Sequence, residues 1–405
     1  HDITIKIAES CKKYKIQKFI YVSTAGANEN SNNFYTKLKG EIDSSVIKLN
    51  LISTIIYRPS LLLGIRKEKR FGEKIAQVVM PYFSNIMPNN YKPIYASSVA
   101  ESMKNISKSN RELLDSNYII NSIDSEEIQV SSDKTIKTKF KLFDGYIVEG
   151  VLIPQNKRMT ACISSQVGCS LSCKFCATGT MDRKRNLSAG EIYDQVVHIR
   201  RQAKENYNFS LSNIVFMGMG EPLLNYSNVI QSIDYLTSSK GLNISKRRIT
   251  LSTSGISKMI KKLADDNIGV NLALSLHAAS DEKRNQIMPI GESNSLNSLK
   301  KALEYYYSKM KKQLTYEYIL FNDFNDSIED AKNLYSFTKH TPSKVNIIEY
   351  NPIENGKYEK SSDLRMNHFI SFLENKGVVI KVRRSRGKDI DAACGQLANK
   401  KSLKN

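Results

Sequence analysis

Six apolar runs, each followed by an amphipathic stretch, constrain the fold more than any other feature of the sequence. The spacing leaves room for one helix between successive runs, which is the pattern of parallel strands joined by helical crossovers. The runs cover residues 213–220, 248–255, 271–278, 314–321, 344–352 and 378–385. Six strand–helix units predict an α/β fold, a partial (β/α)6 TIM-like barrel whose chemistry lies at the carboxyl ends of its strands.

The first hundred residues have a different organisation. An apolar run at 16–28, an amphipathic stretch at 34–49 and a second apolar run at 51–64 follow one another. This alternation predicts a short α/β segment with parallel strands.

Several residues of this segment resemble those of an atypical short-chain-dehydrogenase-like, NAD(P)-binding oxidoreductase. They are Ser23, Tyr35 and Lys39 as a Ser…Tyr-x-x-x-Lys set, "YRPS" at Tyr57–Ser60 and "KPIYASSVAESM" at Lys92–Met103. The chain has no G-x-G-x-x-G sequence, the turn that cradles a dinucleotide pyrophosphate. We therefore predict that residues 1–103 form a truncated Rossmann-like segment that binds no cofactor and catalyses nothing.

A second part of the chain begins near Lys104. Residues 104–127 are polar and charged, and they predict a short helix followed by a polar turn. Residues 134–154 alternate between apolar and polar side chains on both sides of Asp144-Gly145, which is a strong hairpin signal.

The charge balance bears on the partner. The chain has 60 Lys and Arg residues against 40 Asp and Glu residues, a formal net charge of +20. This excess favours a polyanionic partner, although a lysine-rich solvated surface would give the same balance. No apolar run is long enough to span a bilayer and the first residues do not form a signal peptide, so we expect a soluble protein of the reducing cytoplasm.

Three of the six cysteines, Cys169, Cys173 and Cys176, form a C-x-x-x-C-x-x-C sequence. Six cysteines are too few for a disulfide scaffold in this chain, so the group points to metal binding or catalysis. A structural zinc site needs four ligands, and the nearest histidine, His198, lies well along the following helix. A [4Fe-4S] cluster has four irons, so three thiolates leave one iron open to an external ligand.

This cysteine spacing resembles that of the radical S-adenosylmethionine (SAM) superfamily, in which the open iron binds the amino and carboxyl groups of SAM. Further motifs resemble the RlmN/Cfr family of RNA adenine methyltransferases, and specifically its RlmN branch. They are "TACISSQVGCSLSCKFCATGT", "FMGMGEPLLNY", "LSTSG", "LSLHA", "IEYNPI" and "RRSRGKDIDAACGQLA". The resemblance makes residues 104–154 the remnant of an accessory domain plus a β-hairpin, and 155–405 the methyltransferase core. The oxidoreductase-like segment stands where the family has a small helical RNA-binding domain.

The resemblance implies a mechanism that uses two further cysteines. Adenine C2 is electron-poor, so methylation there needs a radical route. Cys394 would take a methyl group from one SAM, and the 5′-deoxyadenosyl radical from a second SAM would remove a hydrogen from it. The resulting carbon radical would add to the adenine. Cys162 would then release the product through a transient disulfide with Cys394, with Glu149 as the proton acceptor.

The resemblance also implies SAM contacts at the ends of the strands. Gly220 and Glu221 match the family's Gly-Glu-Pro motif, where close backbone approach and a carboxylate suit the methionine ammonium. The remaining matches are Ser252, Ser275, Leu276, His277 and Asn351. We expect His277 to line the site as a hydrogen-bonding residue and not to bind metal.

The expected partners follow from the same resemblance. They are 23S rRNA at the peptidyl-transferase centre, tRNA at the adenosine 3′ to the anticodon, and an external electron donor such as flavodoxin. We expect a monomer without a membrane association. Basic runs at 182–185, 246–248 and 381–388 lie beside the motifs and predict a rim that binds RNA phosphates. The sequence leaves open Cfr-like methylation at C8, an NAD(P)-dependent oxidoreductase with an appended barrel, and a zinc-bound RNA-binding protein without catalysis.

Overall fold

The computed structural model describes residues 2–14, 16, 19–49, 51, 54–59, 62–63, 94–97, 99–100, 103, 123–142, 144–239 and 241–399. The chain divides into two compact units, His1–Asn121 and Ser122–Asn405. The domain boundaries after residues 103 and 154 stay predictions, and the helix predicted from Lys104 lies outside the described residues. None of the helices within the described ranges is long and apolar enough to cross a membrane.

The first unit contains a parallel strand–helix–strand arrangement, as expected. Its elements are α1 (Asp2–Lys13), β1 (Phe19–Val22), α2 (Phe34–Lys48), β2 (Thr54–Tyr57), β3 (Leu62–Leu63) and β4 (Ile94–Tyr95). Strand β1 pairs with β2 and strand β3 with β4, both in parallel. Ala8, Phe19, Ile42 and Val46 form a small core between the two helices and β1.

The residues of the predicted Ser–Tyr–Lys set do not form one hydrogen-bonded group. Tyr35 is 56% exposed at the start of α2. The hydroxyl of Ser23 is buried and has no hydrogen-bond partner among the described residues. Lys39 Nζ donates to the carbonyl oxygen of Val22 at 3.4 Å. Ser60 and residues 92, 93, 98, 101 and 102 lie outside the described residues, so the other matching motifs stay predictions.

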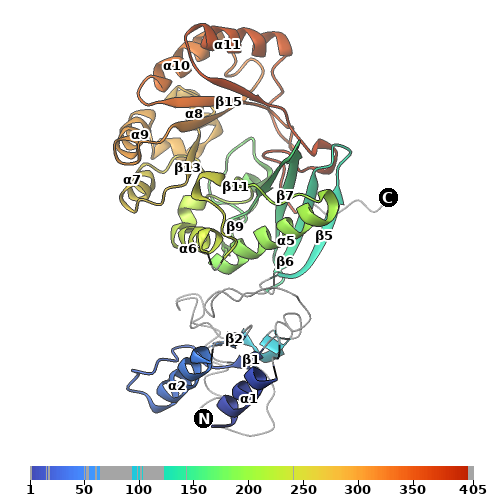
Figure 1. Cartoon of the computed structure of the whole chain (residues 1–405). Coiled ribbons are helices and arrows are strands. Elements are labelled where there is room, and N and C mark those ends of the chain that lie inside the picture. Colours follow the sequence, from blue (N-terminus) through green and yellow to red (C-terminus); the bar gives the residue numbers. More distant parts are fainter. Residues whose placement is uncertain are drawn as a thin grey trace. The chain divides into compact units, whose positions relative to one another are not determined.

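A ten-stranded sheet organises the second unit (Figure 1). The strands lie in the order β16, β15, β14, β13, β12, β11, β8, β7, β6, β5. Strand β8 and strands β11 to β16 run parallel to one another, whereas β7, β6 and β5 continue the sheet in antiparallel fashion. The edge strands β16 and β5 do not pair with each other, so the sheet is an open barrel. The predicted partial barrel is confirmed.

The six predicted strands are all present in the parallel part of the sheet. They are β11 (Asn213–Phe216), β12 (Ile249–Thr253), β13 (Asn271–Ser275), β14 (Leu314–Leu320), β15 (Ser343–Glu349) and β16 (Ile380–Arg383). The remaining strands of this sheet are β5 (Ile123–Val130), β6 (Ile136–Leu142), β7 (Ile147–Gln155) and β8 (Arg158–Cys162). The predicted runs extend past the strand ends, because their last residues form the loops at the carboxyl end of the barrel.

The helices surround the parallel strands on the outside of the curved sheet (Figure 1). They are α5 (Ala189–Tyr207), α6 (Tyr226–Thr237), α7 (Ser257–Asp265), α8 (Asp281–Ile287), α9 (Leu296–Met310), α10 (Ile328–Thr338) and α11 (Asp363–Asn375). Helix α5 begins at a capping box, in which the Glu191 amide donates to Ser188 Oγ and the Ser188 amide donates to the Glu191 carboxylate. Its apolar face, with Ile192, Val196 and Ile199, is buried.

The hairpin predicted at Asp144-Gly145 joins β6 to β7. Gly145 has a φ of +84°, a conformation that glycine adopts without a steric penalty. The polar turn predicted through Glu127 is wrong at its end, because residues 123–130 form the edge strand β5. The charges that suggested a turn are ion pairs with β6: Glu127 with Lys139 at 3.6 Å, and Asp124 with Lys141 at 3.0 Å.

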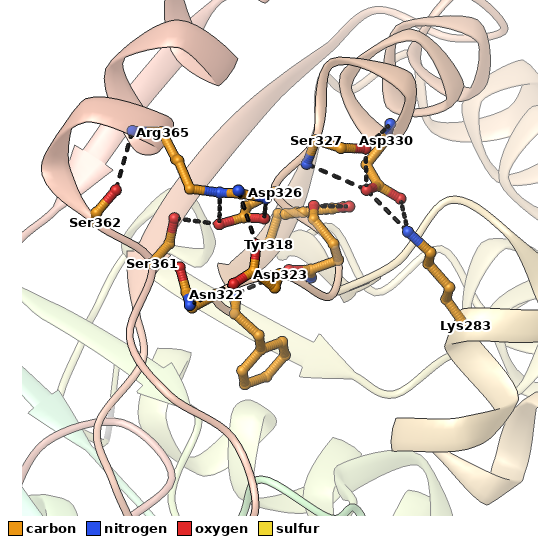
Figure 2. Close-up of polar contacts among 12 residues, drawn as sticks. Lys283, Tyr318, Asn322, Asp323, Asp326, Ser327, Asp330, Ser361, Ser362 and Arg365 are labelled. Atoms are coloured by element: carbon orange, nitrogen blue, oxygen red, sulfur yellow. Dashed lines mark hydrogen bonds and ion pairs between the residues drawn. The ribbon is translucent and has the colours of Figure 1, made fainter.

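Two buried carboxylates tie three helices together beyond the carboxyl end of β14 (Figure 2). Arg365 of α11 donates to the two oxygens of Asp326 at 2.6 and 2.9 Å, and the hydroxyl of Ser361 donates to the same carboxylate at 2.6 Å. Lys283 of α8 donates to both oxygens of Asp330 in α10 at 2.7 and 2.9 Å. Because bidentate pairs fix orientation as well as distance, they hold the loop after β14 in one arrangement.

Candidate active site

One cavity of about 920 Å³ runs through the open barrel. Five of the chain's six cysteines line it, which are Cys162, Cys169, Cys173, Cys176 and Cys394. The predicted SAM contacts in its lining are Gly220, Glu221, Ser252, Ser275 and His277. The other predicted site residues, Leu276, Asn351 and Glu149, are buried but do not belong to the lining.

The three clustered cysteines lie on the loop that follows β8. The Cys176 amide donates to the Cys173 carbonyl at 3.2 Å, and the Lys174 amide donates to the Ile287 carbonyl at 2.9 Å. Gly168 begins the loop with a φ of +74°, and a Cβ at this position would lie 2.1 Å from the carbonyl oxygen of Asp182. Only glycine fits there, so the backbone fixes where the first thiol points.

Burial governs the acidity of the three thiols. It raises the pKa of Cys169 to about 11, raises that of Cys176, and raises that of Cys173 well above the ordinary value. The charges of Cys176 and Cys169 would further oppose ionisation of Cys173. Bound iron replaces these protons with a positive charge, so this donor set suits a metal centre that binds thiolates.

The number and placement of the thiols fit a cluster better than a single ion. Among the described residues, no three His, Cys, Asp or Glu side chains are placed to share one metal ion. A structural zinc site takes four ligands that converge on one centre. In a [4Fe-4S] cluster each thiolate binds a different iron, and three thiolates leave the fourth iron open.

An apolar wall covers one side of the cysteine loop. Cys173 and Cys176 pack against a buried group that includes Phe175, Ile319 and Phe321. The rings of Phe175 and His277 meet edge to face, with centroids 4.8 Å apart. The apolar surroundings of a cluster are one of the factors that set its reduction potential.

Gly220 and Glu221 follow β11 and face the same cavity. Gly220 has a φ of +91°, and a Cβ there would lie 2.5 Å from the side chain of Gln166. The Glu221 carboxylate accepts hydrogen bonds from the amides of Ser254 at 2.7 Å and Leu223 at 3.1 Å. Burial raises the pKa of Glu221. A cationic group in the cavity would favour the charged form of this carboxylate.

His277 has a defined tautomer. Its Nδ1 accepts a hydrogen bond from the Ile319 amide at 3.1 Å, so the ring proton is on Nε2. Burial lowers the pKa of His277 to about 3, which leaves the ring neutral at pH 7. The neighbouring Leu276 contributes its backbone, since its amide donates to the Glu317 carbonyl at 3.0 Å. Ser252 Oγ and Ser275 Oγ are 3.5 Å apart on adjacent strands.

Cys162 and Cys394 lie far apart in the sequence, but both line the cavity. Burial raises the pKa of Cys162 to about 12, with a further increase from Cys394. Cys394 is exposed within the cavity, yet the surrounding protein withdraws it from bulk water and raises its pKa to about 11. The Arg383 guanidinium lowers the pKa of both thiols. Asn351 Nδ2 donates to the Cys394 carbonyl at 3.2 Å.

Arg383 is a site residue that sequence reasoning missed. It lies in the basic run at 381–388, which suggested only RNA contacts. In the structure, Arg383 Nη1 lies 3.2 Å from Glu317 Oε2, and Asn346 Nδ2 donates to Glu317 Oε1 at 2.8 Å. Side chains two residues apart on a strand face the same side, so Glu317 in β14 and Arg383 in β16 could have been assigned to the cavity. Recognising them as a pair, however, requires the order of the strands in the sheet.

Glu149 lies in the middle of β7, away from the cavity lining. Its side chain is 1% exposed. The Ala398 amide donates to Glu149 Oε2 at 3.0 Å, and Lys137 Nζ lies 3.8 Å from Oε1. Glu149 therefore contacts the segment that follows Cys394.

The cavity is basic toward the amino ends of the strands. Arg158, Arg247, Lys344 and Lys381 line this part, and none of them forms an ion pair with another described residue. Burial lowers the pKa of Lys344, and so does the charge of Lys381. That the three basic runs form a rim for RNA phosphates stays a prediction; residues 246–248 lie at the amino end of β12.

Comparisons with known proteins agree with this fold and site. A sequence-family profile described as "Radical SAM superfamily" matches residues 163–335. A Cytophaga hutchinsonii protein named "Probable dual-specificity RNA methyltransferase RlmN" is 59% identical over 300 residues, which are 74% of this chain and 82% of that protein. A protein of the same name from Flavobacterium psychrophilum is 56% identical over 300 residues, 74% of this chain and 86% of that protein. The structure of a radical SAM methyltransferase from Sphaerobacter thermophilus is 36% identical with a TM-score of 0.67, covering 79% of this chain and 88% of that one.

The open barrel with three thiols in the loop after its first parallel strand defines a radical SAM enzyme, a class whose cofactors are a [4Fe-4S] cluster and SAM. Within this class, the chain belongs to the RlmN family of dual-specificity RNA methyltransferases. The matches lend no support to the oxidoreductase resemblance of residues 1–103, which stays a prediction.

Replacing Cys173 by Ala should prevent cluster assembly, because it removes one of three iron ligands. Anaerobically reconstituted wild type should be brown and contain iron and sulfide, whereas the variant should be colourless with almost no bound iron. Cys11→Ala is the matched control, since Cys11 lies in α1 of the other unit and should not affect the colour. A brown Cys173→Ala protein with wild-type iron content would contradict the assignment.

Proposed function

We propose that this chain transfers a methyl group from SAM to C2 of adenosine in 23S rRNA, at the peptidyl-transferase centre, and in tRNA at the adenosine 3′ to the anticodon. The observation that carries the proposal is the shared cavity of five cysteines. Three thiols suffice to hold the cluster, so two remain for covalent chemistry. The relatives are named dual-specificity RNA methyltransferases, which supports RNA as the class of substrate.

The chain's own residues divide the work. When bound, the cluster and SAM supply the one-electron chemistry that activates a C–H bond. Cys169, Cys173 and Cys176 hold the cluster. Glu221 presents a carboxylate for the ammonium of SAM, and the Nε2–H of His277 offers a neutral donor to the same cavity.

Cys394 acts as the methyl carrier and Cys162 as the resolving thiol. Both thiols must lose a proton to become nucleophiles, and the raised pKa of each opposes this at pH 7. The Arg383 guanidinium favours both thiolates. After the methylene carbon has added to adenine, the adduct loses one electron to an external redox partner and its C2 proton to Glu149. The Cys162 thiolate then attacks the Cys394 sulfur, so that the disulfide forms as the bond between this sulfur and the methylene carbon breaks. The released carbon takes up a proton from solvent and becomes the methyl group of the product.

The position of the methyl group on adenine is tested by identifying the modified nucleoside. Purified enzyme with SAM, a reductant and unmodified rRNA and tRNA transcripts should yield 2-methyladenosine, measured by mass spectrometry of RNA nucleosides. This outcome distinguishes the proposal from Cfr-like chemistry. Detection of 8-methyladenosine without 2-methyladenosine would reject C2 specificity while leaving the radical SAM assignment intact.

Cys162→Ala should trap the enzyme on its RNA. The variant keeps the three cluster thiols and the Cys394 carrier, so it should still add the methyl carbon to adenine but could not expel the product. The expected result is a nuclease-sensitive shift on a denaturing gel. The double variant with Cys394→Ala should lose the shift, because no carrier thiol remains. Normal turnover of Cys162→Ala without trapped RNA would contradict the two-cysteine mechanism.

The basic end of the cavity is the proposed route for RNA. Arg158, Arg247 and Lys381 are exposed, and Lys344 is half-buried. These four cations form no ion pair with another described residue, and phosphate groups would relieve the repulsion among them. Arg158, Arg247, Lys344 and Lys381 lie on four strand starts around one opening of the lumen that leads to Cys394. We place the phosphates that flank the target adenosine at this opening.

Neutralising Lys344 and Lys381 together, both to Gln, should weaken binding of an unmodified anticodon stem–loop. We expect affinity to fall about tenfold and the slope of log affinity against log salt to shrink by about 2, one for each lost phosphate contact. Lys258→Gln with Lys261→Gln is the control, because both lysines are exposed on α7 outside the barrel. Equal loss in both double variants would indicate a general charge effect and no local site.

The electron donor and the assembly state complete the proposal. We propose an external low-potential donor such as flavodoxin, and a monomeric enzyme that works where both RNAs occur, in the cytoplasm. We propose that residues 1–103 take no part in this chemistry; the described residues that line the cavity all belong to the second unit.

A further inference from the structure

Residues 384–399, the carrier segment, follow β16 and place Cys394 in the cavity. A short loop at the end of β15 fastens this segment at several points. Asn351 Nδ2 donates to the Cys394 carbonyl at 3.2 Å, and Gln396 Nε2 donates to the Pro352 carbonyl at 3.2 Å. These two bonds attach Cys394 and the residue two positions after it to this loop.

Glu349, the last residue of β15, forms ion pairs with the carrier segment. Its side chain is 4% exposed. Arg384 Nη1 donates to Oε1 at 2.6 Å, Lys388 Nζ donates to Oε2 at 3.2 Å, and the Ser385 amide donates to Oε2 at 3.4 Å. Lys360 Nζ adds a third cation at 3.3 Å from Oε1. One buried carboxylate thus binds both ends of the turn 384–388.

The charge of Glu349 is secure over the working pH range. Burial alone would raise its pKa, but the hydrogen bonds from Arg384 and Lys388 hold the pKa at about 2. Without this negative charge, three cations would face one another around a buried amide, and their repulsion would loosen the turn.

Other contacts of the carrier segment run to the antiparallel side of the sheet. Asp389 accepts hydrogen bonds from the Ser131 hydroxyl at 2.5 Å and the Ser132 amide at 2.9 Å. The Gly387 amide donates to Asp133 at 3.0 Å. The segment therefore spans the gap of the open barrel, between the end of β15 and the turn that joins β5 to β6.

We propose that Glu349 is a positioning residue, which holds the carrier segment so that Cys394 stays in reach of its successive partners. This inference rests on the proposed function, in which Cys394 must meet the SAM methyl group, the adenine and the Cys162 thiol in turn. Three reactions at one sulfur need its placement to be accurate within a fraction of an ångström at each stage. Glu349 belongs to the "IEYNPI" motif, but the sequence does not indicate this role, because its partners lie 11, 35, 36 and 39 residues further along the chain.

The test compares Glu349→Gln, which keeps the shape and loses the charge, with Glu349→Asp, which keeps the charge. The first readout is hydrogen–deuterium exchange of the reconstituted enzyme. We expect faster exchange in residues 384–399 of Glu349→Gln, with wild-type protection in β13 and β14. Faster exchange throughout the barrel would overturn the proposal in favour of a general role in stability.

The second readout is the amount of 2-methyladenosine formed per 5′-deoxyadenosine released. A misplaced Cys394 lets SAM cleavage run without methyl transfer, so this ratio should fall about tenfold or more in Glu349→Gln. Glu349→Asp should restore part of it, while the absorption spectrum of the cluster stays unchanged in both variants. An unchanged ratio, or a loss of both products in proportion, would overturn the proposal.

Two further measurements keep the result unambiguous. Glu359→Gln changes an exposed carboxylate near Lys360 and should behave as wild type. If Glu349→Gln does not fold, Lys388→Met removes one partner at a half-exposed position and should change exchange and product ratio in the same direction. If wild type makes no 2-methyladenosine, the proposed function fails, but the exchange experiment still decides whether Glu349 fixes the carrier segment.

Discussion

Placing five thiols around one cavity is the constraint on which the rest of the structure depends. Burial raises the pKa of these thiols, so the cavity stores them in a protonated, unreactive form. Reactivity then needs a positive charge close by. In the proposed mechanism iron supplies it at the cysteine loop, and the Arg383 guanidinium, which lowers the pKa of Cys162 and Cys394, supplies it for the other two thiols. The cation that each set of thiols meets would then decide whether identical side chains serve as ligands or as nucleophiles.

An open barrel suits this arrangement better than a closed one. In a closed eight-stranded barrel the interior is filled by side chains and forms a core. Here the antiparallel strands β7, β6 and β5 extend the sheet without returning to β16, and the lumen holds a cavity of about 920 Å³. The carrier segment crosses the gap that remains, so the element that closes the barrel also bears the carrier thiol.

The fold could be predicted from the sequence where a short run of residues by itself indicates a strand or the start of a helix. The six apolar runs became β11 to β16, and the capping box at Ser188 marked the start of α5. Strand β5 was missed, because its exposed face carries the acidic residues Asp124 and Glu127, whose lysine partners sit on the neighbouring strand. The cysteine loop was visible as a spacing within eight residues. Arg383 and Glu349 belong to quoted motifs, but their roles could not be predicted, because parallel strands bring together residues that lie far apart in the chain.

Glu149 shows how the carrier segment and the chemistry are linked. Its carboxylate accepts a hydrogen bond from the Ala398 amide at 3.0 Å, and Lys137 Nζ lies 3.8 Å from its other oxygen. In the proposed mechanism this carboxylate takes the C2 proton from adenine, so the proposed proton acceptor is itself a contact of the carrier segment. Glu349 holds residues 384–388 of the same segment through Arg384 and Lys388. Two buried carboxylates therefore contact the segment on either side of Cys394, and both contacts bear on where its thiol lies.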